Sequence, residues 1–190
     1  MANLTLTLSP VIELSREQFY SLCKANRDVR LERTSTGDLI VRPPTGWESG
    51  KRNADLTTDL NNWNRQARLG VVFDSSTGFS LPNGADRSPD VAWVERSRIE
   101  AIDPDPTQFL PLAPDFVIEL RSASDRLSQL QEKMLEYCAC GVRLGWLIDP
   151  QTKRVEVYRP NCPVEVLEHP QQLTGETILP GFVLSLDSIW

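Results

Sequence analysis

Three acidic residues stand in or beside apolar segments, where an unpaired charge is costly. Glu48 opens a predicted helix, Asp90 opens an apolar run at 91–94, and Glu119 interrupts a second run at 116–120. A lone buried carboxylate is strongly unfavourable unless it is paired, protonated or bound to a cation. A divalent metal ion held between two or three carboxylates would remove that penalty. The pattern therefore favours metal chemistry.

Each carboxylate also has an ordinary structural explanation. An aspartate after a proline, as at Asp90, is common in turns. A glutamate in the first turn of a helix, as at Glu48, is stabilised by the helix dipole. Glu119 is harder to explain in this way, because a strand covered on both faces rarely carries a charge. Glu119 is therefore the strongest single candidate.

Further polar side chains lie close to Glu119 in the sequence. Arg121 is two residues away, and Gln129 and Lys133 share one face of the helix that follows. Gln129 and Lys133 point either toward the strand ends or into solvent, and the spacing leaves both options open. Ser122 is predicted first as a helix cap, with a supporting role near the site as the second option.

The composition limits the classes of function. The chain has 190 residues, 40% of them hydrophobic, a formal net charge of −6 and a single histidine. Paired-histidine chemistry and histidine-rich zinc sites are excluded by that one histidine. The acidic balance argues against a simple basic surface for nucleic acid, although a locally positive cleft or a bound metal remains compatible. Four cysteines without C-x-x-C spacing indicate reduced thiols. Because no stretch reaches roughly 18 apolar residues, we expect a cytoplasmic protein without a membrane segment.

The predicted elements begin after a flexible N-terminus, residues 1–14, and residues 15–190 form a single domain. A capping-box pattern at 15–18 starts a short helix, and a turn cluster within 29–41 indicates a β-hairpin. An amphipathic helix covers 56–67. Three short strands after it, at 71–73, 79–81 and 91–94, are predicted to form a β-meander.

The second half of the chain alternates strand and helix. The strand at 116–120 leads through a cap at 122–125 into a helix over 127–138, followed by a strand at 145–148. This order implies a right-handed crossover and parallel pairing of the two strands. The predicted fold class is α/β, with a mixed central sheet and a helix on each face.

Three motifs in this order resemble the Uma-type putative restriction endonucleases, a bacterial family of unknown function grouped with the PD-(D/E)xK nucleases. They are RSPDVAWV at 87–94, APDFVIELRSASD at 113–125, and 132–150 with its EKMLEY and GVRLGWLIDP segments. The similarity extends from about residue 15 to residue 190. It implies a restriction-endonuclease-like sheet flanked by helices, with an N-terminal helix and hairpin.

The resemblance also implies roles for single residues. Asp90 and Glu119 match the family's acidic metal ligands, and Glu48 matches a helix glutamate that supplies a further ligand or positions a water molecule. The superfamily lysine falls at position 121, where this chain has Arg121. Arginine stays protonated, so it stabilises negative charge but cannot act as a general base. Lys133 is the candidate for the lysine role by position.

The expected function is a Mg²⁺-dependent DNA endonuclease, with Mn²⁺ as a substitute, using Asp90, Glu119, Glu48, Lys133 and Arg121. Gln129 and Ser122 are expected to support this site. The alternatives are a catalytically inactive nuclease-fold binding module and a metal-dependent hydrolase of another phosphodiester. The acidic balance predicts weak, salt-sensitive DNA binding. A homodimer is compatible with the resemblance, because nucleases of this superfamily often pair subunits to cut both strands.

Overall fold

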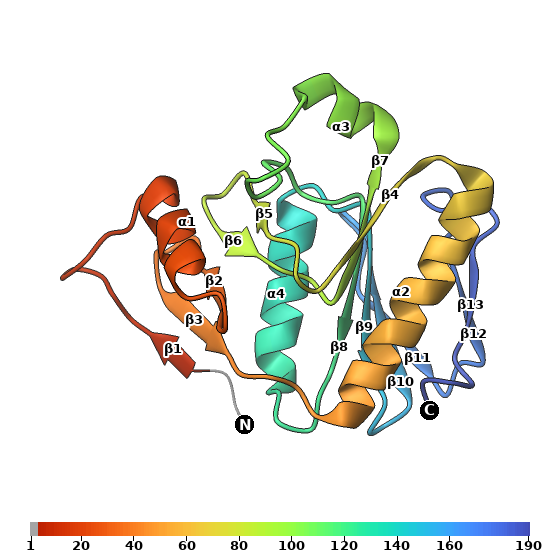
Figure 1. Cartoon of the computed structure of the whole chain (residues 1–190). Coiled ribbons are helices and arrows are strands. Elements are labelled where there is room, and N and C mark those ends of the chain that lie inside the picture. Colours follow the sequence, from red (N-terminus) through yellow and green to blue (C-terminus); the bar gives the residue numbers. More distant parts are fainter. Residues whose placement is uncertain (1–3) are drawn as a thin grey trace.

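A six-stranded mixed sheet lies at the centre of the molecule (Figure 1). The structure is a computed structural model and describes residues 4–190. Across the sheet the strands are β11 (Glu165–Glu168), β10 (Arg154–Tyr158), β9 (Leu144–Asp149), β8 (Phe116–Leu120), β7 (Val91–Glu95) and β4 (Gly70–Asp74). β8 and β9 pair in parallel, and the other neighbouring pairs are antiparallel.

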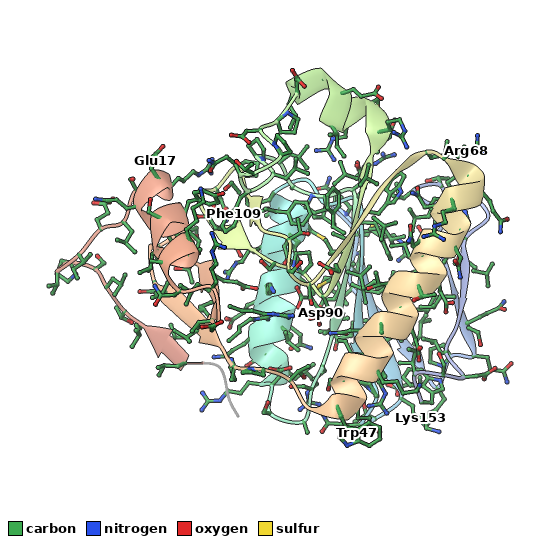
Figure 2. The ribbon with its side chains drawn as sticks, viewed as in Figure 1. Glu17, Trp47, Arg68, Asp90, Phe109 and Lys153 are labelled. Atoms are coloured by element: carbon green, nitrogen blue, oxygen red, sulfur yellow. The ribbon has the colours of Figure 1, made fainter. Side chains whose placement is uncertain are left out.

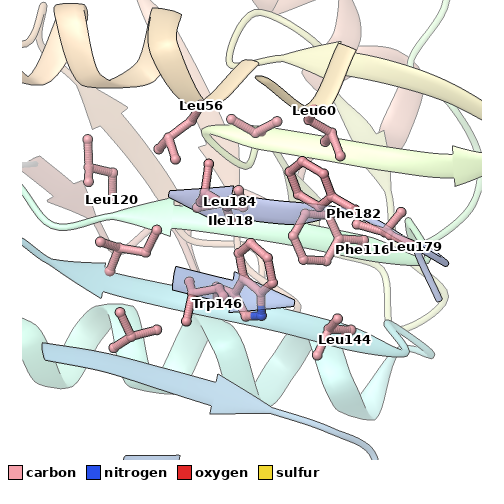
Figure 3. Packing of buried hydrophobic residues seen from close by; sticks show 14 of the residues in the cluster. Leu56, Leu60, Phe116, Ile118, Leu120, Leu144, Trp146, Leu179, Phe182 and Leu184 are labelled. Atoms are coloured by element: carbon pink, nitrogen blue, oxygen red, sulfur yellow. The ribbon is translucent and has the colours of Figure 1, made fainter. Parts of the chain in front are cut away.

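Two helices cover the two faces of this sheet. Helix α2 (Trp47–Ala67) buries Leu56 and Leu60 in one apolar cluster, part of which Figure 3 shows. Helix α4 (Leu127–Ala139) buries Met134 in a second cluster on the other face. Successive strand residues point to opposite faces, so the even-numbered residues of β8 join the α2 cluster while its odd-numbered residues face α4.

A second sheet is built mainly from the N-terminal part of the chain. Its strands, in order, are β1 (Leu4–Leu6), β3 (Leu39–Arg42), β2 (Arg30–Arg33), β6 (Asp86–Arg87) and β5 (Phe79–Ser80). An ion pair of 2.7 Å between Arg33 and Asp86 joins the β2–β3 hairpin to β6. Because β6 leads within a few residues into β7, this sheet is held beside one end of the central sheet (Figure 1).

The remaining elements lie at the periphery. Helix α1 (Arg16–Ala25) precedes the hairpin, and helix α3 (Arg96–Ile102) follows β7. Strands β12 (Gln172–Thr174) and β13 (Val183–Ser185) form a small two-stranded sheet. Within residues 4–190, no helix combines the length and the apolar character that crossing a membrane requires.

The structure confirms the predicted α/β class, with a mixed sheet and a helix on each face. Ser15 caps α1 in a capping box, because its side chain accepts from the backbone N–H of Gln18 while the Gln18 side chain accepts from the Ser15 backbone. The hairpin over 29–41 is present as β2 and β3. The predicted parallel pairing is present between β8 and β9.

Two local predictions are wrong, and one helix is missed. The expected meander does not form, because β4 pairs directly with β7 while β5 pairs with β6 in the other sheet. The expected cap of α4 is also absent: Ser122 bonds to Asp125, and Arg126 occupies the N-cap position without a side-chain hydrogen bond. Helix α3 was not predicted. Residues 4–6 of the N-terminal segment form β1, and residues 1–3 lie outside the described part of the chain.

Candidate active site

Asp90 and Glu119 lie side by side at one end of the central sheet. Antiparallel pairing of Val91 with Ile118 brings the residue before β7 next to Glu119. The Asp90 Oδ2 atom accepts a hydrogen bond of 2.8 Å from the backbone N–H of Leu120, which fixes its position. Both carboxylates line a cavity of about 70 Å³. Figure 2 labels Asp90 near the middle of the molecule.

One oxygen of Glu119 is held by two side chains of α4. Lys133 Nζ lies 2.7 Å from Glu119 Oε1, and the Tyr137 hydroxyl donates to the same oxygen at 3.0 Å. All three side chains are buried. Lys133 and Tyr137 are one helical turn apart, so they share the face of α4 that packs on the sheet. The structure thus brings together Asp90, Glu119 and Lys133 from the set expected from the sequence.

A further buried carboxylate, Glu32 on β2, completes this arrangement, and sequence reasoning missed it. Its oxygens lie 2.9 Å from Lys133 Nζ, 3.3 Å from Arg87 Nη1 and 3.5 Å from Arg42 Nε. The backbone N–H of Ser88 donates to it at 3.3 Å. The sequence signal was weak, since Glu32 lies between Leu31 and an arginine in a short strand whose buried face depends on its packing against α4.

These cations control the protonation of Glu32. Burial alone would raise its pKa, but Arg42, Lys133 and Arg87 outweigh that effect and lower the pKa to about 2. Glu32, Glu119 and Asp90 in turn raise the pKa of Arg42, although its burial acts in the other direction. The Glu32 carboxylate is therefore ionised at neutral pH.

The second oxygen of Glu119 has a different environment. Oε2 is buried and has no hydrogen-bond partner, and the Arg42 Nη2 atom lies 3.8 Å away, beyond hydrogen-bond distance. Burial raises the pKa of Glu119; Asp90 and Glu32 add to the rise, while Lys133 and Arg42 oppose it. An unpartnered carboxylate oxygen in a cavity beside a second carboxylate is a site where a cation would be favourable.

Two residues expected at the site lie elsewhere. The Glu48 side chain is 60% exposed and forms an ion pair of 3.1 Å with Arg52, one turn along α2. Arg121 forms an ion pair of 2.6 Å with Asp149 instead of contacting Glu119. Both line a neighbouring hollow of about 370 Å³ rather than the cavity of Asp90. Glu48 is therefore not placed to join the other two carboxylates, and Lys133, not Arg121, contacts Glu119.

The expected supporting residues are also placed differently. Gln129 is exposed and does not line the cavity of Asp90; it lines a neighbouring pocket together with Glu32 and Lys133. Ser122 lines the cavity, but its hydroxyl donates to Asp125 Oδ2 at 2.6 Å. Trp47, the first residue of α2, does not pack as a hydrophobic staple. Its side chain is 82% exposed at the first turn of α2, where Figure 2 shows it at the edge of the molecule.

The cavity is lined by oxygen donors, which suit Mg²⁺ or Mn²⁺, and by the two arginines Arg30 and Arg42. Asp90 and Glu119 Oε2 could hold such an ion, and two carboxylates are a common protein contribution to a Mg²⁺ site. Within residues 4–190, no three histidine, cysteine, aspartate or glutamate side chains converge closely enough to hold a metal ion. The orphaned Oε2 atom fits a cation, but other ligands must come from other donor types, water or substrate.

Comparisons with known proteins agree with this fold. A crystal structure of a putative nuclease belonging to DUF820 from Anabaena variabilis is similar, with a TM-score of 0.78 and 20% sequence identity over 93% of this chain and 97% of that chain. A comparison with curated proteins found no match. A family model described as Uma2, putative restriction endonuclease, matches residues 16–187. The chain therefore belongs to the Uma2 family of putative restriction endonucleases.

Proposed function

We propose that the protein is a metal-dependent nuclease that hydrolyses phosphodiester bonds in DNA at Asp90, Glu119 and Lys133. Membership of the Uma2 family supports a nuclease. The observation that carries the proposal is the environment of Glu119. One oxygen of this buried carboxylate is bound to a lysine, and the other is unpartnered in a cavity that a second carboxylate also lines.

Each of these residues has a defined part in the proposed reaction. Asp90 and Glu119 Oε2 would hold the metal ion, which when bound would supply a Lewis acid for the phosphate and activate water for the attack. Lys133 fixes the orientation of Glu119 and offers positive charge beside it. Arg42 lines the same cavity and can bind an oxygen of the scissile phosphate, the role that the sequence had suggested for Arg121.

A path for the nucleic acid leads away from this cavity. The hollow of about 370 Å³ that contains Trp47 shares Pro44, Thr45 and Ser49 with the cavity of Asp90. An exposed tryptophan can stack on any base, whatever the sequence. We therefore place a base next to the scissile phosphate on Trp47.

The overall charge predicts how DNA is bound. With a net charge of −6, the protein gains little from neutralising phosphates, so binding is weak and decreases with salt. A homodimer would place two active sites on one duplex and would allow both strands to be cut. Sedimentation analysis with and without a DNA duplex tests this assembly.

A second candidate is a nuclease-fold binding module without turnover. The observation in its favour is that, within the described residues, no three histidine, cysteine, aspartate or glutamate side chains are close enough to hold a metal ion. In this case the metal ion stabilises the protein, and DNA is bound but not cleaved.

The test is cleavage of several substrates by the purified protein. Supercoiled plasmid, single-stranded DNA, RNA and a small phosphodiester are incubated with Mg²⁺ or Mn²⁺, and with EDTA as the metal-free control. We expect plasmid nicking with either metal and none with EDTA. If only the small phosphodiester is cleaved, the substrate is a phosphodiester other than DNA. Binding of DNA and metal without cleavage of any substrate would favour the module.

Two substitutions make the test specific to the site. Asp90→Asn keeps an acceptor for the Leu120 N–H but removes the charge. We therefore expect at least about a 100-fold loss of nicking, equivalent to about 2.7 kcal/mol of transition-state stabilisation. Glu48→Gln removes a carboxylate that lies outside the cavity and is expected to cleave at least as well as the parent. Equal nicking by Asp90→Asn and the parent would contradict the proposed site.

A further inference from the structure

Asn53, on helix α2, has an unpartnered acceptor at the same cavity. Its Oδ1 atom is buried and makes no hydrogen bond, as is the case for Oε2 of Glu119. Asn53, Asp90 and Glu119 all line the cavity of about 70 Å³. Burying a carbonyl oxygen without a hydrogen-bond partner is unfavourable, because the oxygen loses its hydration and gains nothing in return. Two oxygens without partners at one cavity indicate that a cation, which oxygen atoms can coordinate, binds there.

The phase of helix α2 explains why Asn53, and not Glu48, reaches the cavity. Asn53, Leu56 and Leu60 follow the i, i+3, i+7 spacing of one helix face, and both leucines are fully buried. Glu48 precedes Asn53 by five residues, which rotates it by about 140° around the axis. The helix therefore directs Asn53 inward and leaves Glu48 in solvent.

We propose that the Asn53 carboxamide oxygen is a positioning group for the divalent cation, in contact with the ion or with one of its water molecules. The inference rests on the proposed function, because it assumes that Asp90 and Glu119 bind the same ion. A neutral amide oxygen is a suitable partner, since Mg²⁺ and Mn²⁺ prefer oxygen ligands and keep several waters. Asn53 supplies a third protein oxygen without adding a third negative charge.

The rival explanation for Asn53 is a hydrogen-bond donor. The two ends of an amide are assigned from its surroundings, and a rotated Asn53 would direct Nδ2 toward the carboxylates instead of Oδ1. In that orientation the side chain would satisfy the carboxylates without any metal. Asn53→Asp separates the two explanations, because it keeps the oxygen and removes the donor.

The experiment is a calorimetric titration of the folded protein with Mn²⁺ at neutral pH, which does not depend on activity. We expect Asn53→Ala to weaken Mn²⁺ binding about 10- to 100-fold, the range typical of groups that orient metal ligands. Asn53→Asp should bind Mn²⁺ at least as tightly as the parent. In EDTA it should melt at a lower temperature than the parent, because three carboxylates then repel one another.

A matched control and a second site variant make the outcomes distinct. Asn62→Ala changes an exposed asparagine of the same helix and is expected to leave Mn²⁺ affinity unchanged. If Asn53→Ala binds Mn²⁺ as tightly as the parent, Asn53 has no role in positioning the ion. If Asn53→Ala and Asn53→Asp weaken Mn²⁺ binding equally, Asn53 acts as a hydrogen-bond donor instead. If Asp90→Asn no longer binds Mn²⁺ while Asn53→Ala binds it with parental affinity, the inference about Asn53 fails and the proposed metal site stands. If the parent binds no Mn²⁺, the proposed metal site fails as well.

Discussion

The two oxygens of Glu119 divide the site into two regions of different character. The closed side comprises Glu32, Arg87, Lys133 and Tyr137 around Oε1, where charges are paired at 2.7–3.3 Å. The open side comprises Asn53, Asp90 and the cavity at Oε2, where Asn53 Oδ1 and Glu119 Oε2 lack hydrogen-bond partners. Paired buried charges maintain structure, whereas unpaired acceptors are stable only with a ligand. We infer that the closed side holds Glu119 in position and that the proposed metal ion binds on the open side.

The largest effect is expected on the closed side. Glu32→Gln removes the carboxylate that Lys133 and Arg87 share, although Lys133 keeps its ion pair with Glu119 and Arg87 keeps its ion pair with Glu136. We therefore expect a loss of about 3 kcal/mol, the lower end of the range for a broken buried ion pair. Urea denaturation measures the loss. The matched control is Glu165→Gln, which breaks an exposed strand ion pair of 2.8 Å with Arg159 and should cost at most about 1 kcal/mol. If both variants lose the same free energy of unfolding, the buried ion pairs of the closed side contribute no more than a surface ion pair.

The pH dependence of stability tests the same side. The pKa of Glu32 is about 2 in the folded protein, against an ordinary value of 4.5, so the folded state holds fewer protons on this group than the unfolded state. Its contribution is present above pH 4.5 and is lost as the pH falls toward 2, by about 3 kcal/mol in total. In Glu32→Gln, the free energy of unfolding should no longer fall by this amount between pH 4.5 and pH 2. A parental slope in the variant would show that other carboxylates are responsible.

The next effect belongs to the open side. At a Mn²⁺ concentration 100-fold above the dissociation constant, binding stabilises a protein by about 2.7 kcal/mol, or roughly 5–10 °C for a chain of this size. The melting temperature of the parent should rise by this amount, and Glu48→Gln should behave in the same way. Asp90→Asn should show no rise. If Glu48→Gln shows no rise in melting temperature with Mn²⁺, Glu48 binds the ion together with Asp90 and Glu119, as expected from the sequence.

The smallest effect is expected at the edge of the open side. Trp47→Ala should weaken binding of a single-stranded oligonucleotide about 5- to 150-fold, because stacking of one base contributes roughly 1–3 kcal/mol. Trp47→Phe should retain part of the affinity. Anisotropy of a labelled oligonucleotide in EDTA at low salt measures both variants without cleavage. Unchanged affinity in Trp47→Ala would remove the proposed path of the strand.

The sequence predicted the parts of the site that depend on local spacing. Asp90 and Glu119 could be identified because each stands beside or within an apolar strand, and pairing of β7 with β8 brings them together. Lys133 could be identified because it lies on the helix that directly follows Glu119. In each case, short-range order along the chain determines the geometry.

The parts that could not be predicted depend on long-range packing or on helix phase. Glu32 becomes a site residue only because the N-terminal sheet packs on α4, 101 residues further along the chain. Glu48 and Asn53 are five residues apart, and only the orientation of α2 decides which one reaches the cavity. Strands of two residues, such as β5 (Phe79–Ser80), carry too little periodicity to reveal which sheet they join.

The most direct test of the account is a crystal structure of the protein soaked in Mn²⁺, with an anomalous difference map. The account predicts one strong peak within coordination distance of Asp90 and Glu119 Oε2, on the side of the cavity that Asn53 lines. The ion pair between Lys133 and Glu119 Oε1 should remain in place. A map without a peak there, or with Mn²⁺ bound only at Glu48, would contradict it.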